Sequence, residues 1–204
     1  MKKLFLVGFL ALVSVLAFWP GQARGQMGKA CPTNMELFPN DAYKEAGQVY
    51  FQTDESGKAR VEVTYVSPRF FETLKAMKDE IDPARLAMLE KYWDGGKNIL
   101  FVVGLTTHVG SQVCPTLNLS KYRMKKISFL RDAWGKEYKA VGWKEGLSDM
   151  PSMPNHHRVG ILIFSGDDAR GNPVISNKAK FMELVIKGLA GAKKRTFKWN
   201  LPLE

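Results

Sequence analysis

Two short stretches of this chain are apolar at nearly every position: "NILFVVGL" at 98–105 and "RVGILIF" at 158–164. A strand with one solvated face alternates apolar and polar residues, whereas a short continuous apolar run indicates a strand buried on both faces. We therefore expect both segments to be central strands of a sheet. Any fold proposed for the chain must place them in its interior.

Other segments alternate with a period of two residues. In "ARVEVTYV" (59–66), Val61, Val63 and Tyr65 are expected to point inward. They alternate with Arg60, Glu62 and Thr64, which are expected on a solvated face. The segment "RTFKWNL" (195–201) follows the same pattern, with Phe197, Trp199 and Leu201 expected to point inward. Further strands are predicted at 48–53, 124–130, 137–143 and 179–186.

The stretch 68–93 has helical signals. Ser67-Pro68 and Asp82-Pro83 each place a capping side chain before a proline at the first helical position, and Asp94-Gly95-Gly96 supplies a stop. The sequence thus predicts two short helices inserted into a β protein. We interpret their apolar stripe as core rather than as a cofactor pocket.

Regularly spaced short strands, without a strand–helix rhythm, indicate an antiparallel β-sandwich of immunoglobulin-like type. We predict a mainly β domain at 47–204, with the helical hairpin 68–93 as an insert. The composition, 45% hydrophobic and 25% charged in 204 residues, is that of one ordinary globular domain.

The beginning of the chain resembles a targeting segment. "MKK" precedes an uncharged apolar run of 16 residues at 4–19, and small residues follow Pro20. This layout predicts a secretory signal peptide at 1–25, followed by an irregular arm at 26–46. The alternative is an uncleaved anchor, but the run is shorter than the roughly 20 residues that a spanning helix needs. We expect a periplasmic or secreted protein without a transmembrane span after cleavage.

The net charge bears on the partners. Cleavage of the predicted signal peptide removes Lys2 and Lys3 and lowers the net charge of the chain from +10 to +8, or to +7 if Arg24 is lost as well. A basic exported protein meets anionic lipid or cell-wall polymer rather than nucleic acid. The clusters at 121–126 and 192–195 flank predicted strands and are interpreted as solvated ends of these strands. The partners expected are an envelope protein or an anionic envelope surface.

Two cysteines, Cys31 and Cys114, are each followed by Pro-Thr. In an oxidising compartment an even pair of cysteines predicts a disulfide. The alternative, a pair of thiolate metal ligands, usually requires cysteines close together in sequence. We therefore expect Cys31 and Cys114 to form a disulfide that ties the arm to the middle of the domain.

The chemistry-bearing residues gather in "DMPSMPNHHR" (149–158) and around His108. Thioether and imidazole groups are ligands for copper-type metals. A β-turn at 153–156 would bring the Cα atoms of Met153 and His156 within about 7 Å of each other. His156 and His157 then enter a strand, where neighbours point to opposite faces, so only one of them is expected at a given site.

Whether the third histidine, His108, lies at the same site depends on how the strands pair. If 98–105 and 158–164 pair antiparallel, His108 lies beside the His156–His157 pair. The metal ligands predicted are then His108, His156, His157, Met153 and Met150, with copper as the expected ion. The alternative is structural: methionines covering the core, one histidine buried and hydrogen-bonded, and the other exposed.

A wider pattern includes Thr107-His108, Trp143, the run His156-His157-Arg158-x-Gly160-x-Leu162-x-Phe164, and Phe197-x-Trp199. In this pattern residues 99–201 resemble a group of uncharacterised exported β-sandwich proteins. The resemblance implies the sandwich fold and a histidine edge, and no reaction. Pro154-Asn155 stands where that group has glycines, and the helical insert and both cysteines also depart from it. A second resemblance, to periplasmic copper-handling sandwiches, rests on Met and His in such loops.

The sequence contains none of the enzyme signatures H-E-x-x-H, G-x-S-x-G or a phosphate-binding glycine loop. We expect an exported, non-enzymatic sandwich that binds a copper-type ion through a His/Met edge. The alternative is an envelope interaction or scaffold module with purely structural histidines. Its partner surface would be an exposed apolar patch of the helical insert: Phe70, Phe71, Tyr92 and Trp93.

Overall fold

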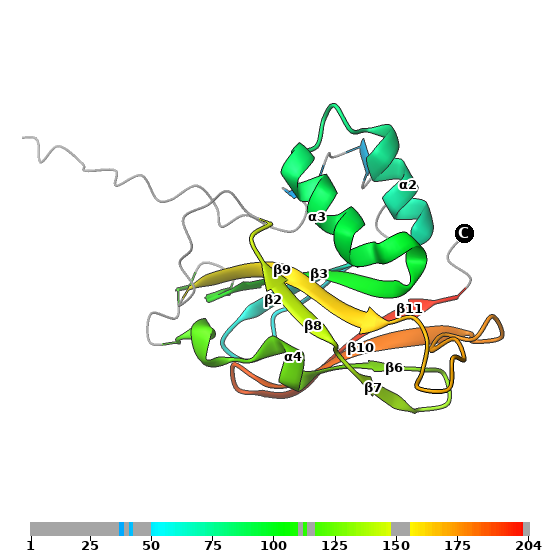
Figure 1. Ribbon diagram of the computed structural model, residues 1–204. Helices are drawn as coiled ribbons and strands as arrows, with labels where there is room; N and C mark the ends of the chain where they lie inside the picture. The colour runs from blue at the N-terminus through cyan, green and yellow to red at the C-terminus, as the bar shows by residue number, and fades with distance from the viewer. Residues whose placement is uncertain are drawn as a thin grey trace, which may run out of the picture. The chain divides into compact units, whose positions relative to one another are not determined.

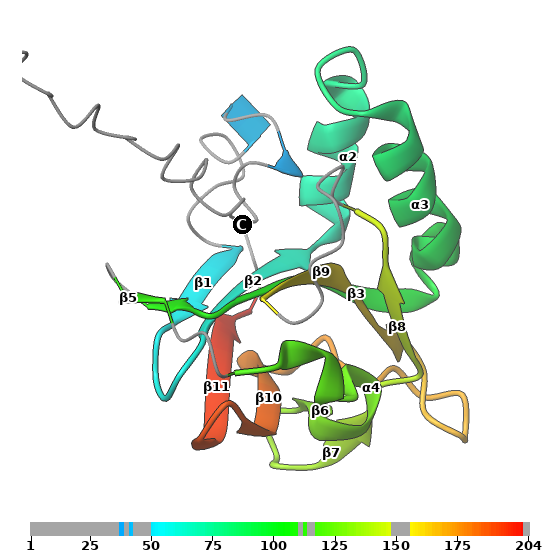
Figure 2. The same ribbon diagram turned by 90° about the vertical axis from the view of Figure 1, so that its left-hand side faces the viewer.

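Two antiparallel sheets lie face to face in the computed structural model (Figures 1 and 2). The structure describes residues 37, 38, 41, 42, 50–109, 112, 113, 117–147 and 156–201; for 108, 109, 112 and 113 only the backbone is described. All of them belong to one compact unit of the chain.

One sheet has five strands in the order β1-β2-β3-β9-β8, and the other has four in the order β11-β10-β6-β7. The five strands are β1 (Phe51–Asp54), β2 (Arg60–Val66), β3 (Asn98–Thr106), β9 (His157–Ser165) and β8 (Gly142–Glu145). The four are β11 (Ala192–Asn200), β10 (Phe181–Leu189), β6 (Ser128–Arg131) and β7 (Glu137–Lys139). Each pair of neighbouring strands in these two sheets is antiparallel.

The strand order is that of an immunoglobulin domain. Such domains place strands A-B-E-D in one sheet and C-F-G in the other. Here β2-β3-β9-β8 and β6-β10-β11 follow that order in chain sequence, with β7 added beside β6 and β1 beside β2. The predicted antiparallel immunoglobulin-like sandwich is confirmed.

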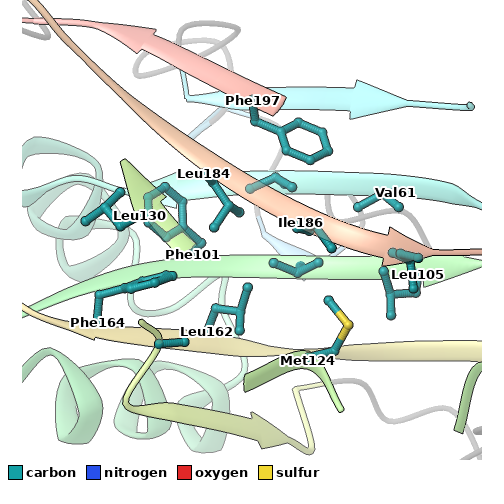
Figure 3. Packing of buried hydrophobic residues seen from close by; sticks show 14 of the residues in the cluster. Val61, Phe101, Leu105, Met124, Leu130, Leu162, Phe164, Leu184, Ile186 and Phe197 are labelled. Atoms are coloured by element: carbon teal, nitrogen blue, oxygen red, sulfur yellow. The ribbon is translucent and has the colours of Figure 1, made fainter. Parts of the chain in front are cut away.

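The inner faces of both sheets form one core (Figure 3). Phe101, Leu162 and Phe164 of the five-stranded sheet pack in a cluster with Leu184 and Phe197 of the other sheet, all of them at most 1% exposed. The buried Trp199 belongs to the same cluster, with its ring centroid 5.2 Å from that of Phe101. The inward positions predicted for Phe197 and Trp199 are therefore confirmed.

The helical hairpin covers the outer face of the five-stranded sheet (Figure 1). Helix α2 (Pro68–Ala76) begins at Ser67, whose side chain accepts a hydrogen bond from the N–H of Phe70. Helix α3 (Pro83–Trp93) begins at Asp82, and the 3₁₀ turn η2 (Asp94–Gly96) follows it. Both caps and both proline starts agree with the prediction.

The helical layer explains why β3 and β9 are apolar on both faces. Leu100 and Val102 of β3 and Ile161 and Ile163 of β9 point away from the other sheet and pack with the hairpin instead. The same cover corrects the prediction for β2, where Thr64 was expected on a solvated face. Thr64 pairs with Val102 on the covered face and is fully buried.

Two predicted strands are corrected. The segment 124–130 begins with a helical turn, α4 (Met124–Ile127), and only then enters β6. The segment 137–143 is split, because β7 pairs with β6 in one sheet and β8 pairs with β9 in the other. The alternation of residues within a segment does not show where the chain crosses between two sheets.

Two short pieces complete the described chain. Strands β4 (His108–Val109) and β5 (Gln112–Val113) form a small hairpin after β3, and the 3₁₀ turn η3 (Leu119–Lys121) precedes α4. The predicted signal peptide 1–25, the cysteines Cys31 and Cys114, and nearly all of the arm 26–46 lie outside the described residues. Among the described helices, none combines the length and apolar character that crossing a membrane requires.

Candidate functional site

The predicted histidine edge comprises Thr107, His108, His156 and His157. The pairing of β3 with β9 builds it. The two strands are antiparallel, with Thr106 opposite His157, so the end of β3 meets the start of β9 as predicted. One residue further, the N–H of Thr107 donates to the carbonyl of His156 over 3.1 Å. Thr107 and His156 are therefore held side by side by the backbone.

A side-chain contact fixes the orientation of the first imidazole. The Oγ1 atom of Thr107 lies 2.5 Å from Nδ1 of His156. Thr107 is completely buried, so this hydroxyl is held in place by its surroundings. Metal-binding histidines usually have one ring nitrogen fixed by such a hydrogen bond, and the other nitrogen then binds the ion.

The two neighbouring histidines lie together instead of on opposite faces. Their ring centroids are 4.3 Å apart and their planes cross at 77°, an edge-to-face contact. The expected alternation of the two side chains to opposite faces is therefore wrong, whereas the expectation that only one of them faces a site stays a prediction. His156 belongs to the turn before β9, so the strict alternation of a strand does not apply to it.

His108 follows Thr107 directly and opens the β4–β5 hairpin, where its backbone pairs with Val113. The structure thus places the backbone of His108 one residue away from the Thr107–His156 contact. Its side chain lies outside the described residues, as do Met150 and Met153. Among the side chains that are described, no group of three or more His, Cys, Asp or Glu residues could hold a metal ion.

An arginine anchors the strand that carries the histidines. Arg158 is buried, and its guanidinium donates to the carbonyls of Leu119 and Tyr122 at 2.9 and 2.7 Å and to the Glu145 carboxylate at 2.8 Å. These bonds tie β9 to β8 and to the segment around η3. Arg158 therefore positions the start of β9 and closes this end of the sandwich.

The Trp143 side chain completes this anchor. Its indole Nε1 donates to Glu145 over 2.7 Å, and its ring lies 5.6 Å from the Arg158 guanidinium. The indole crosses Gly160 so closely that a Cβ atom at this position would lie 2.7 Å from Cζ2 of Trp143. Trp143, Arg158 and Gly160, which the sequence pattern groups with the histidines, are thus parts of one structural support.

The predicted interaction surface on the helical insert is corrected for two of its members. Phe70 and Phe71 have no exposed surface and belong to the cluster between the helices and the sheet. Tyr92 and Trp93 are half-buried and pack against this cluster. The apolar stripe of the hairpin is used to cover the sheet, which leaves Phe70 and Phe71 unavailable to a partner.

A hollow of about 450 Å³ lies at the opposite end of the sandwich. Its walls come from the segment 136–139 and from the loop after β9, and they include Lys136, Ser165, Asp168 and Arg170. Lys136 lies 3.5 Å from Asp168, whose Oδ1 also accepts the N–H groups of Arg170 and Asn172. Asp168 thus mainly orders its own loop.

Comparisons with known proteins add little to this description. No family model matches the chain, and no curated protein matches it. Among solved structures, it is similar to a DUF4426 family protein from Pseudomonas aeruginosa PAO1 with 11% sequence identity and a TM-score of 0.31. The match covers 74% of this chain and 92% of that chain. The likeness is too distant to bear on function, and the resemblance to exported sandwich proteins stays a prediction.

Sequence reasoning did not identify the role of Thr107 or the support formed by Arg158, Glu145 and Trp143. A buried threonine next to a histidine at a strand end is a weak signal, because its partner lies 49 residues away in the sequence. The positive charge of Arg158 directly after the histidine pair was a stronger signal. A single charged residue within a strand buried on both faces requires partners.

Proposed function

We propose that this protein is an exported, non-enzymatic binding module whose histidine edge takes a copper-type ion. The observation that carries the proposal is the paired imidazoles, with His156 oriented by the buried Thr107. Export rests on the predicted signal peptide, and the metal rests on the chemistry of the ligands.

The ligand set suits copper better than hard cations. Imidazole nitrogens bind Cu, Zn and Ni, and a thioether favours Cu(I). His156 and His157 supply two nitrogens from adjacent residues. His108 and Met153, with Met150, are the additional ligands that we propose from the sequence.

The proposal is tested by titrating the protein with Cu(I), Cu(II) and Zn(II). We expect copper to bind the wild-type protein more tightly than a His108→Ala/His156→Ala/His157→Ala variant. Binding of the same strength in both proteins would refute the site. Circular dichroism of each variant verifies that the sandwich is intact.

Two further substitutions separate ligands from support. Thr107→Val keeps the shape of the side chain but removes the hydroxyl, and should weaken binding by about 10- to 100-fold, as loss of a supporting hydrogen bond does. Met153→Leu should weaken Cu(I) binding specifically. Met88→Leu, in helix α3, is the matched control and should leave binding unchanged.

A further inference from the structure

The outer face of the four-stranded sheet is charged along its whole width. Strand pairing places Lys198 beside Glu183, Glu183 beside Arg131, and Arg131 beside Glu137. A second row places Lys194 opposite Lys187, and a third runs from Thr196 through Val185 and Phe129 to Lys139. Paired residues share one face of a sheet. We call this surface the basic face: Arg131, Glu137, Lys139, Glu183, Lys187, Lys194 and Lys198.

The carboxylates of this face are already engaged. Glu137 binds Lys187 at 2.6 Å, and Glu183 binds Arg131 through Nε at 2.6 Å. Lys139, Lys194 and Lys198 have no carboxylate partner within the part of the chain that the structure describes. Seven charged residues thus leave a net charge of +3 on one surface, which strand pairing assembles from segments distant in the sequence.

The outer faces of the two sheets differ in whether helices cover them. The helical hairpin lies over the five-stranded sheet, whereas no described helix lies over the basic face (Figure 1). Lys194 and Lys198 are exposed, and the Lys198 ammonium lies 3.9 Å from the centre of the Phe181 ring. The lysines Lys139, Lys194 and Lys198 of the basic face are therefore open to solvent, whereas Val185 between the rows is fully buried.

Exposed apolar residues occur at one edge of this face. Among the described residues, the large hydrophobic side chains with high exposure are Trp134, at 65%, and Val141, at 50%. Trp134 lies in the turn before β7, and Val141 lies two residues after it. In the sequence, one exposed apolar residue thus precedes the edge strand of the basic face and another follows it.

The turn that carries Trp134 is held rigidly. The buried Asp132 carboxylate accepts the N–H groups of Trp134 and Lys136 at 3.0 and 2.9 Å and the hydroxyl of Tyr138 at 3.2 Å. Tryptophan at an exposed, ordered position suits the boundary between water and lipid, because its ring is apolar and its N–H is polar.

We propose that the basic face docks on an anionic phospholipid bilayer, with Lys139, Lys194 and Lys198 on the headgroups and Trp134 in the interfacial layer. The net positive charge of this face is complementary to an anionic surface. The exposed tryptophan at the edge favours a bilayer over a soluble polyanion, which offers no apolar layer. This inference is independent of the metal proposed at the histidine edge.

The test measures co-sedimentation of the full chain with vesicles of phosphatidylcholine and phosphatidylglycerol in equal parts, and with vesicles of phosphatidylcholine alone. The apolar run at 4–19 is identical in every variant. The quantity to compare is therefore the ratio of the affinity for the phosphatidylglycerol-containing vesicles to the affinity for the phosphatidylcholine vesicles. Each lysine near an anionic bilayer contributes about fivefold to binding. Lys139→Gln/Lys194→Gln/Lys198→Gln should therefore lower the ratio by about 100-fold.

The matched control is Lys75→Gln/Lys78→Gln/Lys91→Gln, which removes the same charge from the helical hairpin on the other sheet. We expect the control to lower the ratio only a few-fold. An equal loss in both triple variants would overturn the proposal, because binding would then depend on net charge alone. Thermal unfolding of both variants verifies that they are folded.

Trp134→Ala distinguishes a bilayer from a soluble polyanion. It should weaken binding to the anionic vesicles severalfold while leaving binding to dextran sulfate unchanged. If Trp134→Ala weakened neither, or if the basic-face variant lost dextran sulfate binding but kept vesicle binding, the bilayer assignment would be wrong. Raising the salt concentration should release the wild-type protein from the anionic vesicles.

Discussion

The outer faces of the two sheets differ in what covers them. On the five-stranded sheet, Leu100, Val102, Ile161 and Ile163 lie beneath the helical hairpin and are at most 5% exposed. On the four-stranded sheet most outward positions carry lysines, arginine and glutamates, although the outward Val185 of β10 is fully buried among them. Both sheets contribute the same kind of apolar inner face to one core. The apolar runs of β3 and β9 therefore reflect the helical layer that covers their outer face.

This difference also separates two kinds of interaction on one molecule. The covered face derives its stability from apolar burial, which is worth about 25 cal/mol per Å². The open face has ion pairs at its surface, which contribute little to folding and leave charge available to a partner. Substitutions that are matched between the two faces can test whether this contrast is real.

The largest effect is expected when a charge is placed on the covered face. Ile161→Lys puts an ammonium group at a fully buried position of β9, with no partner for it. We expect a loss of at least about 4 kcal/mol in the free energy of unfolding, which is in the range of the most damaging single substitutions. Thr196→Lys, at an exposed position on the other outer face, should change it by less than about 0.5 kcal/mol.

Urea unfolding followed by circular dichroism measures both variants. If Ile161→Lys cost as little as Thr196→Lys, the hairpin would not be packed on the sheet in solution. The two faces would then be equivalent.

The second effect concerns the aromatic residues of the hairpin. Phe71 is fully buried, with its ring centroid 4.3 Å from that of Trp93. Phe71→Ala should cost about 3 to 4 kcal/mol, because it leaves a cavity between helix and sheet. Phe129→Ala, at a half-buried position of the open face, should cost only about 1 kcal/mol. Equal costs in urea unfolding would show that Phe71 is not core, and would restore the hairpin as a docking surface.

Much of this contrast was predictable because its signals are local. The caps at Ser67 and Asp82 mark where α2 and α3 begin, and the apolar runs of β3 and β9 mark the central strands. What covers an apolar strand is a tertiary property. The sequence therefore predicted Thr64 to be solvated, although it is buried.

The functional surfaces depend more strongly on tertiary structure. Antiparallel pairing was sufficient to predict that His156 and His157 lie near the end of β3. It did not predict the ring contact, because His156 precedes the strand and its backbone does not alternate. The basic face could not be predicted either, since Lys139 and Lys198 meet only through the pairing of four strands whose order the sequence does not state.

The third effect is expected at the seam between the two sheets. Arg195 of β11 is 1% exposed and donates to the Asp54 carbonyl at 3.1 Å and to the Asp54 carboxylate at the end of β1. Burial would raise the pKa of Asp54, but the Ser56 hydroxyl and N–H and the Arg195 charge together hold it below its ordinary value. Asp54→Asn should cost about 2 kcal/mol at neutral pH, as the loss of a hydrogen bond between charged groups does.

The pH dependence of this variant has a definite sign. The carboxyl of an unfolded aspartate has a pKa of about 3.9. The pKa of Asp54 in the folded protein is lower. The stabilisation is therefore complete only well above about pH 4, and it is lost as the pH falls through the unfolded and then the folded pKa. The stability difference between wild type and Asp54→Asn should shrink in acid. Glu55→Gln, at the neighbouring exposed residue, is the control, and a difference that stayed constant with pH would contradict the role of Asp54.

The smallest effect is expected on the open face itself. Lys187 and Glu137 lie 2.6 Å apart, with 43% and 32% of their side chains exposed. A double-mutant cycle with Lys187→Ala and Glu137→Ala should give a coupling energy of about 0.5 kcal/mol, which decreases as salt is added. Removing one partner of a buried pair costs about 3 to 5 kcal/mol, because it leaves the other charge uncompensated. A single-substitution cost of that size here would mean that something covers this face in solution, and its lysines would then not be available to a bilayer.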